Sequence, residues 1–350
     1  MIKIQNIYYM LAYAYQAIEN QQVKKLGSEE FDYIEDLFAV ILIKSIRLQL
    51  RRGLLRDYKS FDQVMEAPKG KIIVPKTVRE VANHSGKVAC RVEEYTENTY
   101  ANQIIKATAR VLLHSSNVRM SNKNELKSLM RYFDFVDSIA VYNVRWSSLR
   151  FTGQNRAYVM MMNVCRIILE EQLVSQREGQ YLFQDISEKR LFALYQRFVF
   201  EYYRYHFHSI RVEAPHLLWD TDDDYQQLLP DMETDITLQY KGCTLIIDTK
   251  MYNDPLQTNR YGNKTIRSSH LYQIFAYVKN WKNKQDKVSG MLLYAASENE
   301  KPNEEYSMSG NRISVKTLDL DVDFSCLSSQ LDDIVNKWLA EYDLHCEKTL

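Results

Sequence analysis

Hydrophobic positions recur with two different periods along this chain, and the change of period predicts its elements. Apolar residues return every three or four positions over residues 6–20, 32–52, 98–117, 123–139, 157–173, 188–207, 268–281 and 330–342, a spacing that predicts amphipathic helices. Short aliphatic and β-branched runs over 228–240, 243–250, 289–296 and 313–320 predict strands. A helix, a hairpin, a helix and further strands in that order predict a mixed α/β sheet in the C-terminal half.

A different pattern interrupts the helices between about residue 54 and residue 95. Three short alternating or β-branched segments, 58–65, 71–78 and 87–94, are separated by Pro68, Gly70 and the polar turn 83–86. We therefore expect a small β-subdomain within an N-terminal α+β domain of residues 1–180. A polar stretch over 175–185 marks the boundary with a second domain, residues 181–350.

Two helix ends carry recognisable signals. Asn6 is a plausible N-cap for the first helix, because its side chain can accept a bond from the free N–H groups of the first turn. Gly53 follows the second helix, in the position where a left-handed residue commonly ends one.

The runs 228–240 and 243–250 flank Lys241-Gly242, a pair that predicts a two-residue hairpin turn. With the turn centred there, paired residues have numbers that sum to 483. Since side chains alternate between faces, one face carries Glu233, Asp235, Asp248 and Lys250. Asp235 then lies opposite Asp248 and Glu233 opposite Lys250. The other face turns towards a core and carries Ile236, Leu238, Leu245 and Ile247.

Directly opposed carboxylates repel each other, so Asp235 against Asp248 destabilises the hairpin unless a positive charge lies between them. Mg²⁺ supplies such a charge, since it prefers carboxylate, water and phosphate oxygens. Lys250, on the same strand and face as Asp248, could position a water or stabilise charge on a phosphate. The pattern therefore predicts a metal site for phosphodiester hydrolysis, with Asp235 and Asp248 as ligands.

A purely structural interpretation is also open. Glu233 and Lys250 could form a cross-strand ion pair, with both aspartates solvated at the strand ends. The acidic-Xaa-Lys pattern also recurs at Asp57, where no opposed carboxylate accompanies it, and at Glu125, which lies in a helical pattern where positions two apart do not share a face.

Two flanking helices offer further candidates. Glu201 lies at the edge of the apolar stripe of helix 188–207, from which it could reach the metal or a water. On helix 268–281, His270, Gln273 and Tyr277 follow one another at spacings of three and four and so share a face.

Composition excludes several classes of protein. The 350 residues carry 45 Lys and Arg against 45 Asp and Glu, so no global basic field announces nucleic-acid binding. The five cysteines show no paired spacing, which argues against a disulfide framework and against structural zinc. No Gly-Xaa4-Gly-Lys-Ser/Thr run exists, so the chain is not itself a P-loop NTPase. The longest apolar run, 37–43, is too short for a bilayer and no signal-peptide pattern opens the chain, so we expect a cytoplasmic protein.

The order helix, acidic hairpin and helix, with Glu201, Asp235 and the Asp248-Thr249-Lys250 tripeptide, resembles the PD-(D/E)XK nuclease superfamily. More specifically, the chain is similar to the McrC family, the nuclease subunits of McrBC 5-methylcytosine restriction systems. The resembling stretches span nearly the whole chain: residues 6–14, 51–54, 69–72, 101–106, 194–198, 232–236 and 271–273.

This resemblance implies a restriction-endonuclease-like C-terminal domain and an N-terminal domain that docks on a partner. In the family, a separate AAA+ GTPase ring recognises modified cytosine and translocates double-stranded DNA, while the McrC-like chain stimulates GTP hydrolysis and cuts. Asp235 and Asp248 would bind Mg²⁺ and Lys250 would be the catalytic lysine, with Glu201 and Gln273 in supporting roles. Met251 departs from relatives that often have an aromatic residue there. Two alternatives are a non-catalytic adaptor of an NTPase ring and a stand-alone nuclease for other DNA structures.

Overall fold

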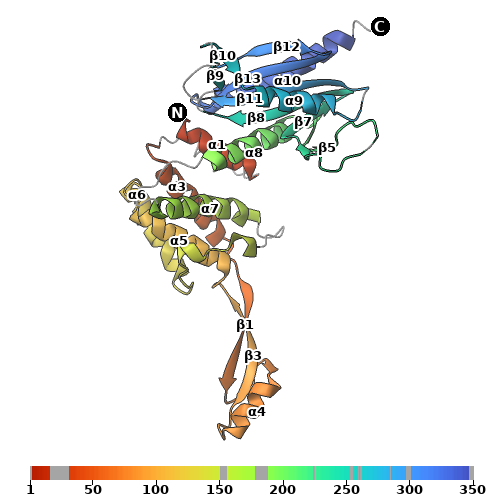
Figure 1. Cartoon of the computed structure of the whole chain (residues 1–350). Coiled ribbons are helices and arrows are strands. Elements are labelled where there is room, and N and C mark those ends of the chain that lie inside the picture. Colours follow the sequence, from red (N-terminus) through yellow and green to blue (C-terminus); the bar gives the residue numbers. More distant parts are fainter. Residues whose placement is uncertain are drawn as a thin grey trace. The chain divides into compact units, whose positions relative to one another are not determined.

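The computed structural model describes residues 2–15, 31–149, 156–177, 188–223, 225–252, 255–258, 260, 262–283, 285–296 and 301–346. The chain forms two compact units, which we call the sheet unit (Met1–Asp32 with Ile186–Leu350) and the arm unit (Tyr33–Asp185). The division at residue 185 lies close to the one expected at 180. The first 32 residues, however, belong with the C-terminal half, because their helix packs on a later one (Figure 1).

The sheet unit is built on a six-stranded mixed sheet in the order β12-β13-β11-β8-β7-β4, in which β11 runs parallel to both β8 and β13. The mixed α/β class is therefore confirmed. The strands of the whole sheet unit, including those outside the six-stranded sheet, are β4 (Arg211–Glu213), β5 (His216–Leu217), β6 (Met232–Glu233), β7 (Ile236–Tyr240), β8 (Cys243–Met251), β9 (Leu256–Thr258), β10 (Lys264–Ile266), β11 (Lys287–Ala296), β12 (Glu304–Met308) and β13 (Asn311–Asp319). The helices of the sheet unit are α1 (Ile4–Ala14), α8 (Glu188–His206), α9 (Ser268–Lys279) and α10 (Phe324–Cys346).

The β7–β8 hairpin has the predicted turn and register. Lys241 and Gly242 both have positive φ, 43° and 77°, as a type I′ turn requires. The pairs run from Tyr240 with Cys243 to Ile236 with Ile247, each summing to 483. The ladder ends there, so the expected pairing of Glu233 with Lys250 is wrong. Glu233 pairs instead with His216 in the small β5–β6 sheet.

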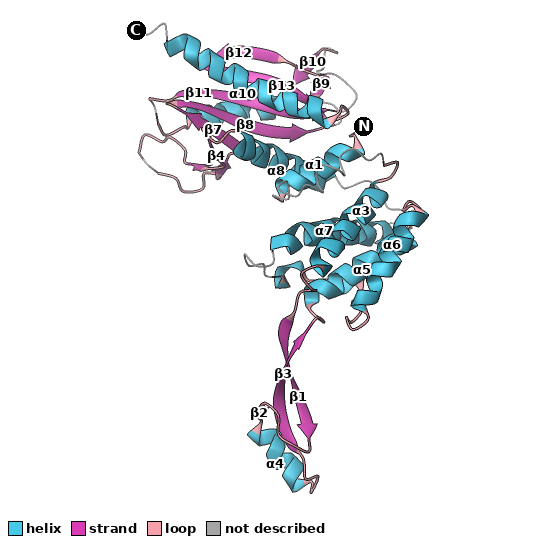
Figure 2. Cartoon of the chain, turned by 180° about the vertical axis from the view of Figure 1, so that it is seen from behind, coloured by secondary structure: helices cyan, strands magenta, loops and turns pink. Residues whose placement is uncertain are grey.

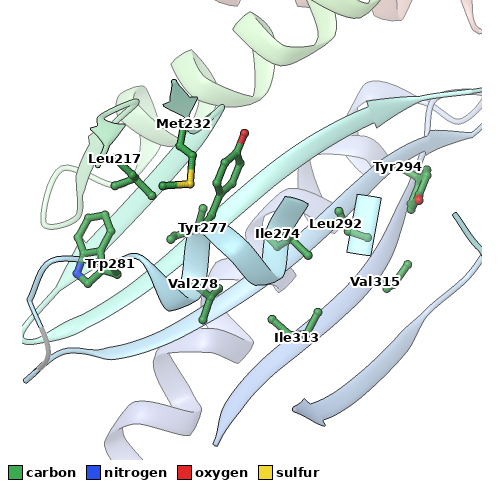
Figure 3. Packing of buried hydrophobic residues seen from close by; sticks show 11 residues of the cluster. Leu217, Met232, Ile274, Tyr277, Val278, Trp281, Leu292, Tyr294, Ile313 and Val315 are labelled. Carbon is green, nitrogen blue, oxygen red and sulfur yellow. The ribbon is translucent and has the colours of Figure 1, made fainter. Parts of the chain in front are cut away.

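Helices cover both faces of this sheet, so the expected contrast between a polar and an apolar hairpin face is wrong. On one face, α9 packs over Ile246 and Leu292, and Figure 3 shows Leu292 with Ile274, Tyr277 and Val278 of this cluster. On the other face lies α10, which Figure 2 shows in front of β11 and β13. A central strand that is covered on both sides must bury nearly every residue, and β8 buries its first seven.

Gly290 sets how closely α9 approaches the sheet. A Cβ atom on this residue would lie 2.8 Å from Cγ1 of Ile274 and 2.9 Å from Cγ2 of Val278. Both atoms belong to α9, so the helix rests directly on the backbone of β11.

Helix α1 attaches to the sheet unit through Asn6, which does not cap the helix as expected. Asn6 lies inside α1 and is completely buried, and its Nδ2 donates to the carbonyl oxygens of Leu320 and Val322 at 2.9 and 2.8 Å. Residues 16–20 of the predicted helix lie outside the described residues.

The arm unit combines packed helices with an extended arm that consists of β1, β2, α4 and β3 (Figure 2). The expectation of strands between 54 and 95 is confirmed, except that most of segment 71–78 is helical because Pro75 lies in the first turn of α4 and favours helix initiation there. The elements are α3 (Ile34–Leu50), β1 (Asp57–Met65), β2 (Lys71–Ile72), α4 (Val74–Ala82), β3 (Val88–Thr96), α5 (Tyr100–His114), α6 (Met120–Met130) and α7 (Arg156–Arg177), with short 3-10 turns at Arg131–Phe133, Val141–Asn143 and Trp146–Ser148.

The base of the arm is fixed by one buried side chain. Asn102, on α5, donates from Nδ2 to the carbonyl oxygen of Leu55 at 2.9 Å and to that of Glu97 at 2.7 Å, which lie just outside β1 and β3. Its Oδ1 accepts a bond from the hydroxyl of Tyr158 on α7 at 3.0 Å. The motif at residues 101–106 thus joins both strands of the arm to the helices.

Across the described residues, no helix is both long and apolar enough to cross a membrane.

Candidate active site

Asp235 lies directly before β7, and its carboxylate reaches the neighbouring strand. Oδ2 accepts bonds from the backbone N–H of Thr249 at 2.7 Å and from the Thr249 hydroxyl at 2.6 Å. These bonds explain why the hairpin ladder ends at Ile236, because a side chain has taken the place of the next backbone pair. The structure therefore places Asp235 beside β8 at the level of Asp248, as the register predicts.

The second oxygen of Asp235 is held by a residue that sequence reasoning missed. Gln196, on α8, donates from Nε2 to Oδ1 of Asp235 at 2.9 Å. The available signal was the motif at residues 194–198, which contains this glutamine, but a single polar residue beside an apolar stripe does not reveal its distant partner.

Asp248 and Lys250 form a close ion pair on β8. Their Oδ2 and Nζ atoms lie 2.7 Å apart, with the aspartate side chain 1% exposed and the lysine side chain 12% exposed. The lysine Nζ also donates to Oε1 of Gln273 at 3.0 Å, and Gln273 donates from Nε2 to the hydroxyl of Tyr277 at 2.8 Å. The polar face predicted for helix 268–281 thus lies against the lysine.

Burial raises the pKa of both aspartates above the ordinary value. The pKa of Asp248 rises to about 6, because burial outweighs the opposing effect of Lys250 and the charge of Asp235 adds to the rise. The pKa of Asp235 is also raised by burial, although its bonds from Thr249 and the charge of Lys250 act in the other direction. One lysine therefore does not balance the two carboxylates, and the pocket favours a further positive charge.

The donor set fits Mg²⁺ better than a metal that prefers nitrogen or sulfur ligands. Asp235 is anchored on Thr249, the residue between Asp248 and Lys250, and Mg²⁺ commonly takes one or two carboxylates and completes its shell with water and phosphate oxygens. Among the residues that the structure describes, no group of three or more His, Cys, Asp and Glu side chains could hold a metal.

Two residues expected at the site have other partners. Glu201 is buried on α8, where its carboxylate lies 3.1 Å from Arg197 and 3.7 Å from Arg204. The side chain of Glu233 is 68% exposed and lies 3.9 Å from that of His216. The structural interpretation, an ion pair of Glu233 with Lys250 beside solvated aspartates, is therefore wrong, because Lys250 pairs with a buried Asp248.

Comparison with known proteins agrees with the resemblance read from the motifs. The family model described as McrBC 5-methylcytosine restriction system component matches residues 3–295. A curated relative from Escherichia coli K12, the type IV methyl-directed restriction enzyme EcoKMcrBC, is 29% identical over 345 residues, which cover 97% of this chain and 99% of the relative.

A solved structure has a similar fold. It is the half-complex from a tetradecameric assembly of Thermococcus gammatolerans McrB AAA+ hexamers with bound McrC, and the matching chain has a TM-score of 0.54 at 17% sequence identity. The match covers 95% of this chain and 76% of that chain. Since the family model spans most of the sequence, from the first helix through the β7–β8 hairpin to β11, the chain belongs to the family of McrBC 5-methylcytosine restriction system components.

Proposed function

We propose that this chain is the nuclease subunit of a restriction complex that acts on DNA containing 5-methylcytosine. It would be a Mg²⁺-dependent endonuclease that hydrolyses phosphodiester bonds of double-stranded DNA while it is docked on an AAA+ GTPase ring. The proposal is supported by the bond of Asp235 to Thr249, which lies between the paired residues Asp248 and Lys250 on β8, in a chain that belongs to a restriction-system family.

Asp235 and Asp248 are the residues that would hold the ion. Gln196 and Thr249 fix both oxygens of Asp235, so the orientation of this carboxylate is set before any ligand arrives. Residues that orient a metal ligand in this way typically affect metal affinity or activity 10–100-fold. When bound, Mg²⁺ would neutralise charge on the scissile phosphate and lower the pKa of a coordinated water.

Lys250 would stabilise the negative charge that develops on the phosphate during hydrolysis. Gln273 holds the lysine Nζ from one side, and Tyr277 fixes the amide of Gln273 in turn. A lysine whose Nζ is held by two partners, Asp248 and Gln273, loses little freedom when the substrate arrives, because its position is already set. Glu201 is a less direct candidate, since its carboxylate is engaged by two arginines.

The arm unit is the part that we propose to dock on the ring and to stimulate its GTPase activity. None of the described residues of α4 is buried, and three valines one turn apart, Val74, Val78 and Val81, are at least 60% exposed. An exposed apolar helix face of this kind is typical of a surface that a protein partner covers. The McrC chain of the similar solved structure is bound to AAA+ hexamers, which supports the same arrangement here.

Cleavage of methylated DNA by the chain together with its ring partner and GTP tests the proposal. We expect Asp248→Ala and Lys250→Ala to lower the cleavage rate by a factor on the order of 10³ or more, because each removes a charge from the reacting centre. Both variants should still bind the ring and stimulate GTP hydrolysis. Glu233→Gln is the matched control, since it removes a nearby charge that does not contact Lys250.

Continued cutting by the Asp248→Ala complex would reject the assignment of the site. Stimulated GTP hydrolysis without any cutting by the wild-type complex would instead favour the non-catalytic adaptor.

A further inference from the structure

A cluster of aromatic and basic side chains lies beside the catalytic lysine and has no role in the function proposed above. The guanidinium carbon of Arg267 lies 5.0 Å from the ring centre of Tyr252, and that ring lies 5.1 Å from the ring of His270. Nδ1 of His270 is 2.8 Å from the hydroxyl of Tyr294. The cluster therefore forms a continuous row from Arg267 to Tyr294.

This row ends next to the metal pocket. Tyr294 lies on β11 directly opposite Lys250 on β8. The charges of Asp248 and Arg267 both act on the pKa of the Tyr294 hydroxyl, in opposite directions, after the larger effect of burial. The pKa of His270 falls to about 4 because of burial, and Lys250 and Arg267 add to the fall. Arg267 is thus within electrostatic reach of the residues around both Asp248 and Lys250, and His270 is neutral at physiological pH.

Arg267 has the features of an anion-binding residue that lacks its anion. Its Nε is shielded from water and makes no hydrogen bond, and among the described residues no carboxylate forms an ion pair with it. A guanidinium that is half-buried without a partner is costly, because it loses hydration and gains only its contact with an aromatic face. Stacking on Tyr252 also fixes the plane of the guanidinium fork, whose geometry matches two oxygens of a phosphate.

The surrounding sequence has the same charge character. Between residues 250 and 267, the basic residues are Lys250, Arg260, Lys264 and Arg267, whereas Asp254 is the one acidic residue. This excess of positive charge in the segment that leads to Arg267 suits a DNA backbone, which carries one negative charge per nucleotide.

We infer that Arg267 binds a backbone phosphate of the DNA strand that lies in the catalytic pocket, with Tyr252 and His270 as the residues that position its guanidinium. The inference rests on the proposed nuclease function and adds a contact that aligns the strand for cutting. Arg267 contacts substrate away from the scissile bond, so its main effect is on DNA binding rather than on the chemical step.

Salt dependence of cleavage by the full chain with its ring partner tests this contact. Affinity for DNA falls as salt rises, and each lost phosphate contact makes the slope of log affinity against log salt shallower by about 1. For Arg267→Gln we expect a roughly 10-fold or greater rise in KM for DNA, a smaller change in kcat, and a salt slope reduced by about 1. Arg267→Lys keeps the charge and should restore the slope. Lys282→Gln, which removes an exposed charge just beyond the far end of α9, is the matched control and should leave both quantities unchanged.

Variants of Tyr252 test the positioning role. Tyr252→Phe keeps the stacking ring and should behave as wild type. Tyr252→Leu removes the ring and should raise KM for DNA, as Arg267→Gln does. An Arg267→Gln complex whose salt slope equals that of Lys282→Gln would overturn the inference. An equal rise in KM for Arg267→Gln and Lys282→Gln would also overturn it. These outcomes are read against a wild-type complex that cuts, so they are distinct from failure of the nuclease proposal, in which the wild type itself does not cut.

Discussion

Strands β8 and β1 have the same length but opposite environments. Both contain nine residues, yet β8 buries the first seven and β1 exposes the first eight. Strand β8 is an inner strand of a sheet that helices cover on both sides, so its core positions are fixed by packing and its charged side chains are the ion pair of Asp248 and Lys250. Strand β1 has no such cover, and the arm depends on strand pairing and on its attachment at the base.

The difference suits the division of labour that we propose for the two units. A catalytic group needs a rigid, poorly hydrated setting, which the sheet unit provides at the end of a buried strand. A docking element needs exposed side chains, which the arm provides along the first eight residues of β1 and throughout α4. Substitutions in the two regions should therefore differ in kind, and the following three predictions test whether they do.

The largest effect on folding is expected at the base of the arm. Asn102→Ala removes the donors to Leu55 and Glu97 and the acceptor for Tyr158, and each buried polar group left without a partner costs about 1–3 kcal/mol. We expect the free energy of unfolding of the arm unit to fall by about 3 kcal/mol or more, measured by thermal unfolding, with faster hydrogen exchange in β1 and β3. Gln103→Ala, the adjacent residue on α5, is the control with one side-chain amide contact. Equal losses in both variants would show that the base of the arm has no special role.

The next effect has the opposite sign and lies at the buried end of β8. Asp248 has a folded-state pKa of about 6 against an ordinary 3.8, so the folded protein binds more protons than the unfolded chain between those pH values. The contribution of this residue to the free energy of unfolding is therefore fully present below pH 4 and is lost as pH rises through about 6. Each pKa unit corresponds to about 1.4 kcal/mol, which gives a cost of about 3 kcal/mol at pH 7 in the absence of metal.

Asp248→Asn should consequently stabilise the metal-free protein at pH 7 while it abolishes cutting, and the gain should disappear below pH 4. Mg²⁺ should raise the unfolding temperature of the wild type and not that of the variant, because only the wild type would bind it at this site. The exposed Asp321→Asn is the control and should change stability by less than about 0.5 kcal/mol. A variant that is less stable than wild type in EDTA at pH 7 would contradict the burial argument.

The smallest effect on stability is expected at the tip of the arm. Val78 on α4 is 60% exposed, so Val78→Ser should alter the free energy of unfolding by less than about 0.5 kcal/mol. The same substitution should weaken association with the AAA+ ring, measured by titration of the ring with the labelled chain. Val40→Ser is a matched control for burial, because this valine of α3 is 7% exposed and its loss should instead lower stability. Unchanged ring binding by Val78→Ser would remove the tip from the docking surface.

Local signals account for the part of the site that the sequence predicts. The Lys241-Gly242 turn fixes the hairpin register, and the register alone brings Asp235 to the level of Asp248. The distant contacts follow from packing that no local pattern encodes. Gln196 reaches Asp235 because of the way α8 packs in the fold. Glu201, on the same helix, pairs with Arg197 instead.

The same limit applies to the fold. Helix periods predict α3, α5, α8 and α9 to within a few residues, since amphipathic spacing is a local property. The membership of α1 in the sheet unit is not local, because Asn6 finds its carbonyl partners more than 300 positions away.

Gly290 shows how a residue without a side chain can govern chemistry that it does not touch. A side chain at this position would crowd Ile274 and Val278 of α9, the helix that also carries Gln273 to the ammonium group of Lys250. The bare backbone of β11 is therefore a spacer between the helix and the strand that bears the lysine. Gradual enlargement of this one residue would test how far the Lys250–Gln273 bond depends on that spacing.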